Sequence, residues 1–276
     1  MPLAGFKCPK GRNEGRVPFS FCETDCPERC YPLPLLMSFA GDREIIPKMY
    51  SVTELVKPRQ QVYYSRNFDY WVSPESQVWL TFGTGIHKAI EMGYDRIQNK
   101  NNHIIEKRCE VSLQTPMGVA VLRGTPDHVD LTENTLYDYK SSGSFQVKKL
   151  WQAVMDGATW LEEDYFIQLN VYRAFFYPTI SRLRLVCLVK DWTTRMTGEM
   201  NRIEFVEVPV ANVEDVKVWA IDRISTFMLD ELNPGSIAKC GPKDTWDGRR
   251  CREYCNAADV CPQFKGGTKV RGGNDG

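Results

Sequence analysis

Two short stretches near the middle of the chain carry residue types that bind metal ions and act on phosphates. One ends in Asp127, and the other is Asp138-Tyr139-Lys140. Side chains two residues apart on a strand lie on one face, so Asp138 and Lys140 are expected on one side and Tyr139 on the other. Pairing with the neighbouring strand is expected to bring Asp127 beside Asp138. Two carboxylates at that distance repel each other unless a cation lies between them, which predicts a Mg²⁺ or Mn²⁺ site.

Such a site has the components for metal-assisted hydrolysis of a phosphodiester. A bound divalent ion polarises the scissile phosphate and lowers the pKa of a bound water. Lys140 would orient or deprotonate that water, or stabilise negative charge in the transition state. The main-chain carbonyl of Tyr139 would add one more metal ligand.

An isolated Asp-x-Lys triplet is weak evidence, because most such triplets form solvated salt bridges. Residues on two predicted helices strengthen it. His87 lies on the helix before the triplet, and imidazole is an accepted ligand of Mn²⁺. Gln168 and Tyr172 are four residues apart on the helix after it, so they face one way. We expect this pair to contact a nucleic-acid backbone or to support Lys140.

The elements that position these residues follow from hydrophobic periodicity and turn residues. The predicted elements are, in order, a helix over 81–98, a hairpin of strands 108–114 and 118–130, a strand over 135–140, a helix over 161–177, strands over 182–190 and 202–210, and a helix from Asn212 to about residue 231. The hairpin and the next strand are expected to form a three-stranded meander. This order predicts a mixed α/β fold, with a central mixed sheet flanked by helices.

The motifs resemble those of RecB-like nucleases of the PD-(D/E)XK superfamily. Four stretches come in that family's order: Gly83-Thr84-Gly85-Ile86-His87-Lys88-Ala89-Ile90-Glu91, Gly124-Thr125-Pro126-Asp127, Asp138-Tyr139-Lys140-Ser141 and Gln168-Leu169-Asn170-Val171-Tyr172. The resemblance covers roughly residues 51–264. It implies a restriction-endonuclease-like sheet and a catalytic Lys140. The other roles that it implies are metal binding by His87, Asp127 and Asp138, and the family's Q-x-x-x-Y pair at Gln168 and Tyr172.

Eight of the ten cysteines lie towards the two ends of the chain, in two sets of four. The N-terminal set is Cys8, Cys22, Cys26 and Cys30, and the C-terminal set is Cys240, Cys251, Cys255 and Cys261. The first residues lack the long apolar core of a secretory signal. Clustered cysteines in such a chain favour metal binding, with disulfides as the alternative.

The late cysteines Cys251, Cys255 and Cys261 resemble the C-terminal trio of iron–sulfur RecB-like nucleases. That group includes AddB-type helicase–nucleases and small CRISPR-associated exonucleases of the adaptation machinery. The resemblance implies a [4Fe–4S] cluster, and zinc is the alternative. The chain departs from the family in its first gap of three residues, where two are common, and in Lys57, which stands where the early fourth cysteine is expected. We therefore expect Cys240, rather than an N-terminal cysteine, to complete the set.

The N-terminal cysteines are predicted to form a second metal site that holds zinc or another cluster. Residues 1–50 are rich in Pro, Gly and Cys and show little periodicity. A bound metal would order a segment with too few apolar residues to fold alone. Unpaired thiols in an unstructured arm are the alternative.

The composition is that of an ordinary globular protein with no bulk charge signal. Lys+Arg and Asp+Glu both number 35, so the formal net charge is zero and any nucleic-acid surface must be local. Trp151, Trp160 and Tyr165 are candidates for stacking on bases, with packing in the core as the alternative that we favour for at least some of them. No stretch approaches the roughly 20 apolar residues that span a membrane. We expect a cytoplasmic protein that does not bind membranes.

These observations predict four segments. They are a cysteine-rich segment over 1–50, a nuclease core over 51–235, an iron–sulfur segment over 236–264 and a disordered tail over 265–276. The predicted function is a Mg²⁺- or Mn²⁺-dependent deoxyribonuclease that acts on single strands or ends. Its expected partners are DNA and proteins of a recombination or CRISPR adaptation complex. The alternatives are a non-catalytic nucleic-acid-binding module with structural metal sites, and a redox or sensor protein built on the cysteines.

Overall fold

The computed structural model describes residues 3–40 and 44–264 of the 276-residue chain. The tail predicted over 265–276 lies outside the described residues. The chain divides into two compact units, which are described separately. Unit 1 comprises Met1–Ile45, Pro58–Gln77 and Asp230–Gly276, and unit 2 comprises Ile46–Lys57 and Val78–Leu229.

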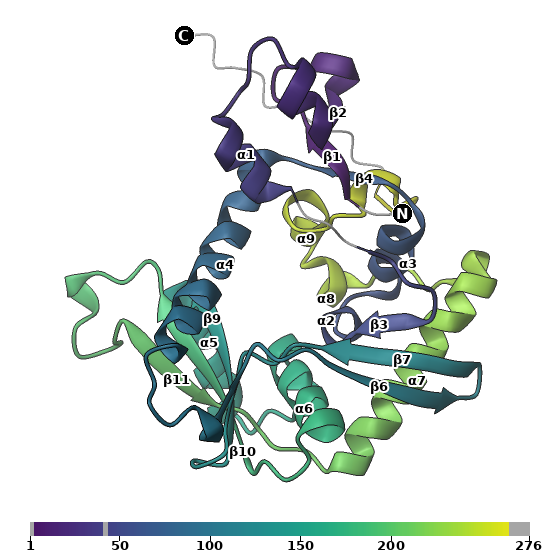
Figure 1. The fold of residues 1–276 in the computed structure, drawn as a ribbon. Coiled ribbons are helices and arrows are strands. Elements are labelled where there is room, and N and C mark those ends of the chain that lie inside the picture. Colours follow the sequence, from purple (N-terminus) through teal and green to yellow (C-terminus); the bar gives the residue numbers. More distant parts are fainter. Residues whose placement is uncertain (1–2, 41–43, 265–276) are drawn as a thin grey trace. The chain divides into compact units, whose positions relative to one another are not determined.

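Unit 2 contains a five-stranded sheet in the order β11-β10-β9-β8-β5; Figure 1 labels its strands β9, β10 and β11. Its strands are β5 (His103–Ile105), β8 (His128–Asp130), β9 (Thr135–Ser142), β10 (Arg182–Val189) and β11 (Ile203–Glu207). β9 and β10 are parallel, and the other neighbours are antiparallel. The central strand β9 has the buried residues Leu136 and Asp138, so this strand carries both core and candidate site residues.

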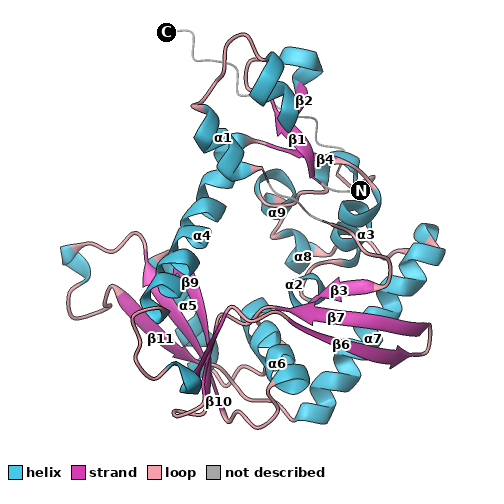
Figure 2. Cartoon of the chain, in the orientation of Figure 1, coloured by secondary structure: helices cyan, strands magenta, loops and turns pink. Residues whose placement is uncertain are grey.

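A second sheet of unit 2 has the order β3-β7-β6 (Figure 2). Its strands are β3 (Met49–Ser51), β6 (Cys109–Thr115) and β7 (Gly118–Gly124). The predicted hairpin of β6 and β7 is confirmed, but the predicted three-stranded meander is wrong. β7 pairs with β6 and β3, whereas β8 pairs with β9 and β5 in the larger sheet. The chain leaves one sheet for the other at Thr125-Pro126, where proline lacks the N–H that a continuing strand needs.

The helices associated with unit 2 are α2 (Val52–Leu55), α4 (Pro74–Tyr94), α5 (Ser144–Met155), α6 (Asp164–Phe176) and α7 (Val213–Leu232); the first residues of α4 and the last of α7 belong to unit 1. The predicted helix start at Asn212 is confirmed, because its side chain accepts hydrogen bonds from the N–H groups of Glu214 and Asp215. At the start of α2, Ser51 and Glu54 form a capping box.

Helix α6 packs against β9 and β10 and is buried on several sides. Phe166 and Leu169 are fully buried. Asn170 is buried as well, and its amide donates to the carbonyls of Phe166 and Pro209 and accepts from the N–H of Ala211. Because every polar atom of this buried amide has a partner, its burial costs little. The helix therefore holds a fixed position beside the strand that carries Asp138.

Unit 1 contains a sheet in the order β2-β1-β4, with β1 (Leu3–Lys7), β2 (Arg16–Pro18) and β4 (Tyr70–Val72). Its helices are α1 (Leu33–Phe39), α3 (Arg59–Asn67), α8 (Pro242–Thr245) and α9 (Arg249–Glu253). Segments from both ends of the chain meet here. Lys7 pairs with Asp259 at 2.8 Å, and Arg59 pairs through two nitrogens with the buried Asp230. The first 40 residues thus have more regular structure than their composition predicts.

Each of the three sheets combines parallel and antiparallel neighbours. The predicted mixed α/β class is therefore confirmed. Among the described residues, no helix is both long and apolar enough to cross a membrane.

Candidate active site

Three carboxylates lie side by side across three neighbouring strands of the larger sheet. Antiparallel pairing of β8 with β9 ends at His128 and Tyr137, so the next position places Asp127 opposite Asp138. On the other side, the Glu106 N–H donates to the Asp127 carbonyl at 3.1 Å, which continues the pairing of β5 with β8. Cross-strand neighbours share a face of the sheet. The register alone therefore gathers Glu106, Asp127 and Asp138.

Asp138 and Lys140 lie on the same face of β9, as their spacing predicts. The Lys140 Nζ is 2.6 Å from Asp138 Oδ2 and stands over the ring of Tyr165, 5.1 Å from its centroid. Burial by itself would lower the pKa of Lys140, but Asp138 and Asp127 outweigh it and raise the pKa above its ordinary value. Lys140 is therefore held in its charged form.

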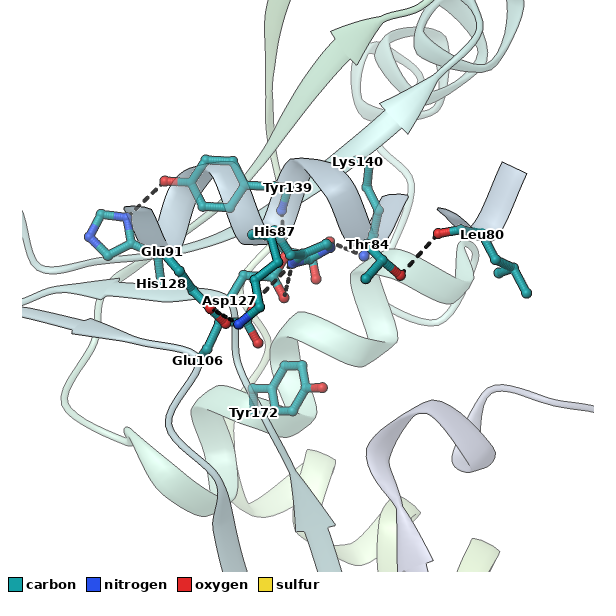
Figure 3. Close-up of polar contacts among 12 residues, drawn as sticks. Leu80, Thr84, His87, Glu91, Glu106, Asp127, His128, Tyr139, Lys140 and Tyr172 are labelled. Atoms are coloured by element: carbon teal, nitrogen blue, oxygen red, sulfur yellow. Dashed lines mark hydrogen bonds and ion pairs between the residues drawn. The ribbon is translucent and has the colours of Figure 1, made fainter. Parts of the chain in front are cut away.

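Tyr139 turns to the opposite face, also as predicted (Figure 3). Its hydroxyl lies 3.0 Å from His128 Nδ1, and its main-chain N–H donates to Asp127 Oδ2 at 2.7 Å. The second bond fixes one oxygen of Asp127 and leaves the other, Oδ1, to face His87 at 3.7 Å. Tyr139 thus orients a candidate ligand through its main chain.

His87 reaches the carboxylates from helix α4. Its Nδ1 lies 2.7 Å from Glu106 Oε1, and this contact raises the pKa of His87. The candidate ligand atoms of His87, Glu106 and Asp127 all lie within 4.8 Å of one another. Asp138 stands next to this group, paired with Lys140, and is not part of the group of three.

Glu106 is the site residue that sequence reasoning missed. It follows β5 in an irregular segment and belongs to no motif. The other glutamate of this stretch, Glu110, pairs with Arg108 at 2.7 Å. Glu106 has a φ of 46°, a left-handed conformation that is unfavourable for a residue with a side chain. Strain of this kind gathers at functional sites, and here it accompanies the contact with His87.

The electrostatics of the carboxylates favour a bound cation. Asp127 is 7% exposed and Asp138 is 1% exposed. Burial and the charge of Asp138 raise the pKa of Asp127 to about 7. The two buried oxygens of Asp138 have no hydrogen-bond partner besides the Lys140 ammonium among the described residues. Buried carboxylates with this few donors are stabilised by a cation, and an imidazole with carboxylates suits Mn²⁺ or Mg²⁺.

Gln168 and Tyr172 lie on one side of α6, and the Gln168 amide is 3.5 Å from the Tyr172 hydroxyl. Tyr172 is 3% exposed, and burial raises its pKa to about 12. Such a buried ring supports the site rather than contacting a nucleic-acid backbone. A Cβ at Gly124 would lie 2.4 Å from Cε1 of Tyr172. The close approach of this ring explains the glycine that begins the 124–127 stretch.

The two histidines outside the motifs form a separate cluster. His103 Nδ1 lies 3.1 Å from His128 Nε2 and 3.6 Å from Asp130 Oδ2. Because His128 also contacts Tyr139, the cluster is on the face of the sheet opposite Asp138. Asp130 already accepts from the main-chain N–H groups after it. These contacts form a satisfied hydrogen-bond chain beneath the candidate site.

The aromatic candidates for base stacking have partners within the protein. The Trp151 indole donates to the carbonyl of Phe205, and Trp160 packs edge-on against Trp219. Tyr165 lies under Lys140. Of these three, Tyr165 is the residue that borders the carboxylate site.

The four C-terminal cysteines line one cavity in unit 1. Cys240, Cys251, Cys255 and Cys261 surround it together with residues that include Gln60, Ala257 and Phe264. The side-chain amide of Gln263 bonds both the N–H and the carbonyl of Cys240, each at 2.8 Å. This clamp holds Cys240 beside the trio, so the structure brings together the four cysteines that the sequence grouped. All four thiols are free, and the donor set suits a thiolate-bound metal group.

The four N-terminal cysteines line a different cavity of the same unit. Cys8, Cys22, Cys26 and Cys30 are again free thiols and surround it with residues that include Phe6, Val17 and Leu36. Each predicted set of four therefore has a cavity of its own.

Comparison with known proteins bears on the fold. No family model matches the chain, and no curated protein matches it. Among solved structures, the crystal structure of SSO0001 superposes with a TM-score of 0.51 at 18% identity, and the match covers 83% of this chain and 92% of that one. At this identity the likeness indicates a shared fold.

Proposed function

We propose that this chain is a metal-dependent deoxyribonuclease of the RecB-like PD-(D/E)XK superfamily, with a restriction-endonuclease-like central sheet. One observation carries the proposal. Among residues 3–40 and 44–264, the Lys140 ammonium is the one donor to buried Asp138, which lies next to Asp127, whose pKa is raised, and to the His87–Glu106 pair. A salt bridge that only stabilised the fold would not need further buried carboxylates, because burying each of them costs desolvation free energy.

The residues of the site would have different roles in hydrolysis. Asp127, Asp138, His87 and Glu106 would hold Mg²⁺ or Mn²⁺, and the bound ion would polarise the phosphate and activate a water. The Tyr139 carbonyl is a further proposed ligand. Lys140 is held charged, so it is placed to stabilise the negative charge that develops on the phosphate. Tyr165 lies under the Lys140 ammonium, and the buried ring of Tyr172 supports the neighbouring strands.

DNA is the proposed substrate, with single strands or free ends favoured by the resemblance. The C-terminal cysteines would hold a [4Fe–4S] cluster that fixes the late segment of unit 1, with zinc as the alternative. Proteins of a recombination or CRISPR adaptation complex are the proposed partners.

The proposal is tested with labelled single-stranded DNA and end-bearing duplexes in Mn²⁺ or Mg²⁺. We expect metal-dependent cleavage by the wild type and none by Asp138→Asn. The matched control is Glu110→Gln, which removes a carboxylate paired with Arg108 outside the site and should leave cleavage unchanged. Cleavage that persists in Asp138→Asn would refute the assignment. DNA binding by the wild type without cleavage would favour the non-catalytic alternative.

A further inference from the structure

The four N-terminal cysteines are brought to one cavity by different parts of the first 40 residues. Cys8 follows β1, Cys22 lies within a π-helical turn (Phe21–Asp25) and Cys26 ends that turn. Cys30 precedes α1. Each of the four lines the same cavity. A segment that folds so that all of its cysteines face one space is typical of a thiolate-bound metal site.

We infer that this cavity holds a second iron–sulfur cluster, distinct from the one proposed at the C-terminal cysteines. The inference concerns the fold of unit 1 and does not rest on the proposed nuclease activity. Four cysteine thiolates are the ligand set of both [2Fe–2S] and [4Fe–4S] clusters. A single zinc ion would use the same four ligands, so the choice between them depends on how far apart the sulfur atoms lie.

The spread of the sulfur atoms favours a cluster over a single ion. Four thiolates on one zinc lie about 3.8 Å apart, given Zn–S bonds of about 2.3 Å in a tetrahedron. Within the described part of the chain, three or more candidate ligand atoms lie within 4.8 Å of one another in two groups, and both are His–carboxylate groups. In this part of the chain, therefore, neither set of cysteines has three sulfur atoms within 4.8 Å of one another. Sulfur atoms that surround a cavity at a wider spacing suit a group of several metal ions.

The walls of the cavity suit an anionic cluster. Phe6, Val17 and Leu36 are almost fully buried and form an apolar lining. The guanidinium of Arg29 also lines it and donates to the carbonyls of Cys22 and Glu23, at 2.8 and 2.7 Å. This side chain fixes the turn that carries Cys22 and places a positive charge near that cysteine.

A bound cluster also explains how this part of the chain is ordered. The core around the cysteines contains few buried side chains: Phe6, Val17, Cys22, Leu36, Phe39, Tyr70 and Val72. Five of these side chains come from the first 40 residues, and Tyr70 and Val72 come from β4. So small a core gains stability from a bound metal group. The ten cysteines are free, so thiolate–metal bonds are the cross-links that these residues can provide.

The test uses the full-length protein purified without oxygen, with iron, sulfide and zinc measured per chain. We expect the paired variant Cys22→Ser/Cys26→Ser to keep only the iron and sulfide of the C-terminal cluster, which is about half of the wild-type amount if the N-terminal cluster is [4Fe–4S] and about two thirds if it is [2Fe–2S]. A Cys251→Ser/Cys255→Ser variant should keep the remainder, about half or about one third, and this iron then belongs to the N-terminal site. Cys109→Ser is the matched control, because Cys109 lines neither cavity, and its metal content should equal that of the wild type.

Several outcomes would overturn the inference. One is zinc in the wild type that is lost from Cys22→Ser/Cys26→Ser while iron is unchanged. Another is a Cys251→Ser/Cys255→Ser variant without iron, or an N-terminal variant with the iron and sulfide of the wild type. If the N-terminal variant does not fold, the remaining iron in the C-terminal variant still decides the question. Nuclease activity is read separately, since Asp138→Asn should retain all of its iron.

Discussion

Lys140 and Asp138 form an ion pair of 2.6 Å on one face of β9, and Asp138 is almost fully buried there. The next carboxylate along the row is Asp127, one strand away. The arrangement places one buried ammonium against two carboxylates, so a negative charge remains for a divalent cation to offset. A surface salt bridge has no such unbalanced buried charge. The imbalance leads to predictions for Lys140 and for Asp127.

Lys140→Ala should lower kcat for DNA cleavage by about 10²- to 10³-fold, the usual cost of removing one group that stabilises transition-state charge. Mn²⁺ affinity should not fall, because Lys140 supplies no ligand and competes electrostatically with the ion. Single-turnover cleavage and calorimetric titration of Mn²⁺ measure the two effects. Loss of Mn²⁺ binding together with activity would instead assign Lys140 a structural role.

Asp127→Asn should stabilise the metal-free protein. Burial and Asp138 raise the pKa of Asp127 to about 7, so keeping it ionised at pH 8 costs free energy. The amide removes the charge, and its oxygen can still accept the Tyr139 N–H. We expect a gain of about 1 kcal/mol, or a Tm increase of about 2–4 °C.

Added Mn²⁺ should make the wild type more stable than Asp127→Asn. It should raise the Tm of the wild type and have little effect on Asp127→Asn, because the variant lacks a ligand. Thermal melts at pH 8, with and without Mn²⁺, measure both. An Asp127→Asn protein that is less stable than the wild type without metal would contradict the repulsion between the carboxylates.

Local features of the sequence were sufficient to predict several elements. The alternation in Asp138-Tyr139-Lys140 placed the side chains on the observed faces, and the helix predicted from Asn212 begins there with an N-cap. No helix was predicted over 144–155, although Val147, Leu150, Trp151 and Val154 recur at helical spacing and Val147 and Leu150 are the buried residues of α5.

Long-range pairing was the part that local patterns could not predict. The strand predicted over 118–130 is divided between two sheets, since β7 pairs with β3 and β8 pairs with β5. β1 pairs in parallel with β4, far along the chain. Glu106 enters the site through the same kind of pairing, because its N–H extends the β5–β8 ladder to Asp127. The spacing of residues along the sequence does not predict this contact between Glu106 and Asp127.

Gly124→Ala should destabilise the protein by about 1–3 kcal/mol, the usual cost of forcing an additional methyl group into a packed core. Its Cβ would lie 2.4 Å from Cε1 of Tyr172 and 2.9 Å from Cγ2 of Val52. Gly143→Ala is the control, because its Cβ would have its nearest neighbour, Asp191 Oδ2, at 3.5 Å. Urea unfolding of both variants measures the difference, and equal stabilities would mean that the Tyr172 ring moves aside freely.

Glu106→Gln should weaken Mn²⁺ binding and cleavage by about 10- to 100-fold, as expected when a group that holds or orients a ligand loses its charge. Glu106 contacts His87 Nδ1 at 2.7 Å and belongs to the group of three candidate ligands. Glu110→Gln is the matched control from the same stretch of chain, since Glu110 pairs with Arg108. Titration of Mn²⁺ and cleavage rates at saturating metal separate binding from catalysis. If both variants behave like the wild type, then Glu106 is an ordinary partner of His87 and the metal is held without it.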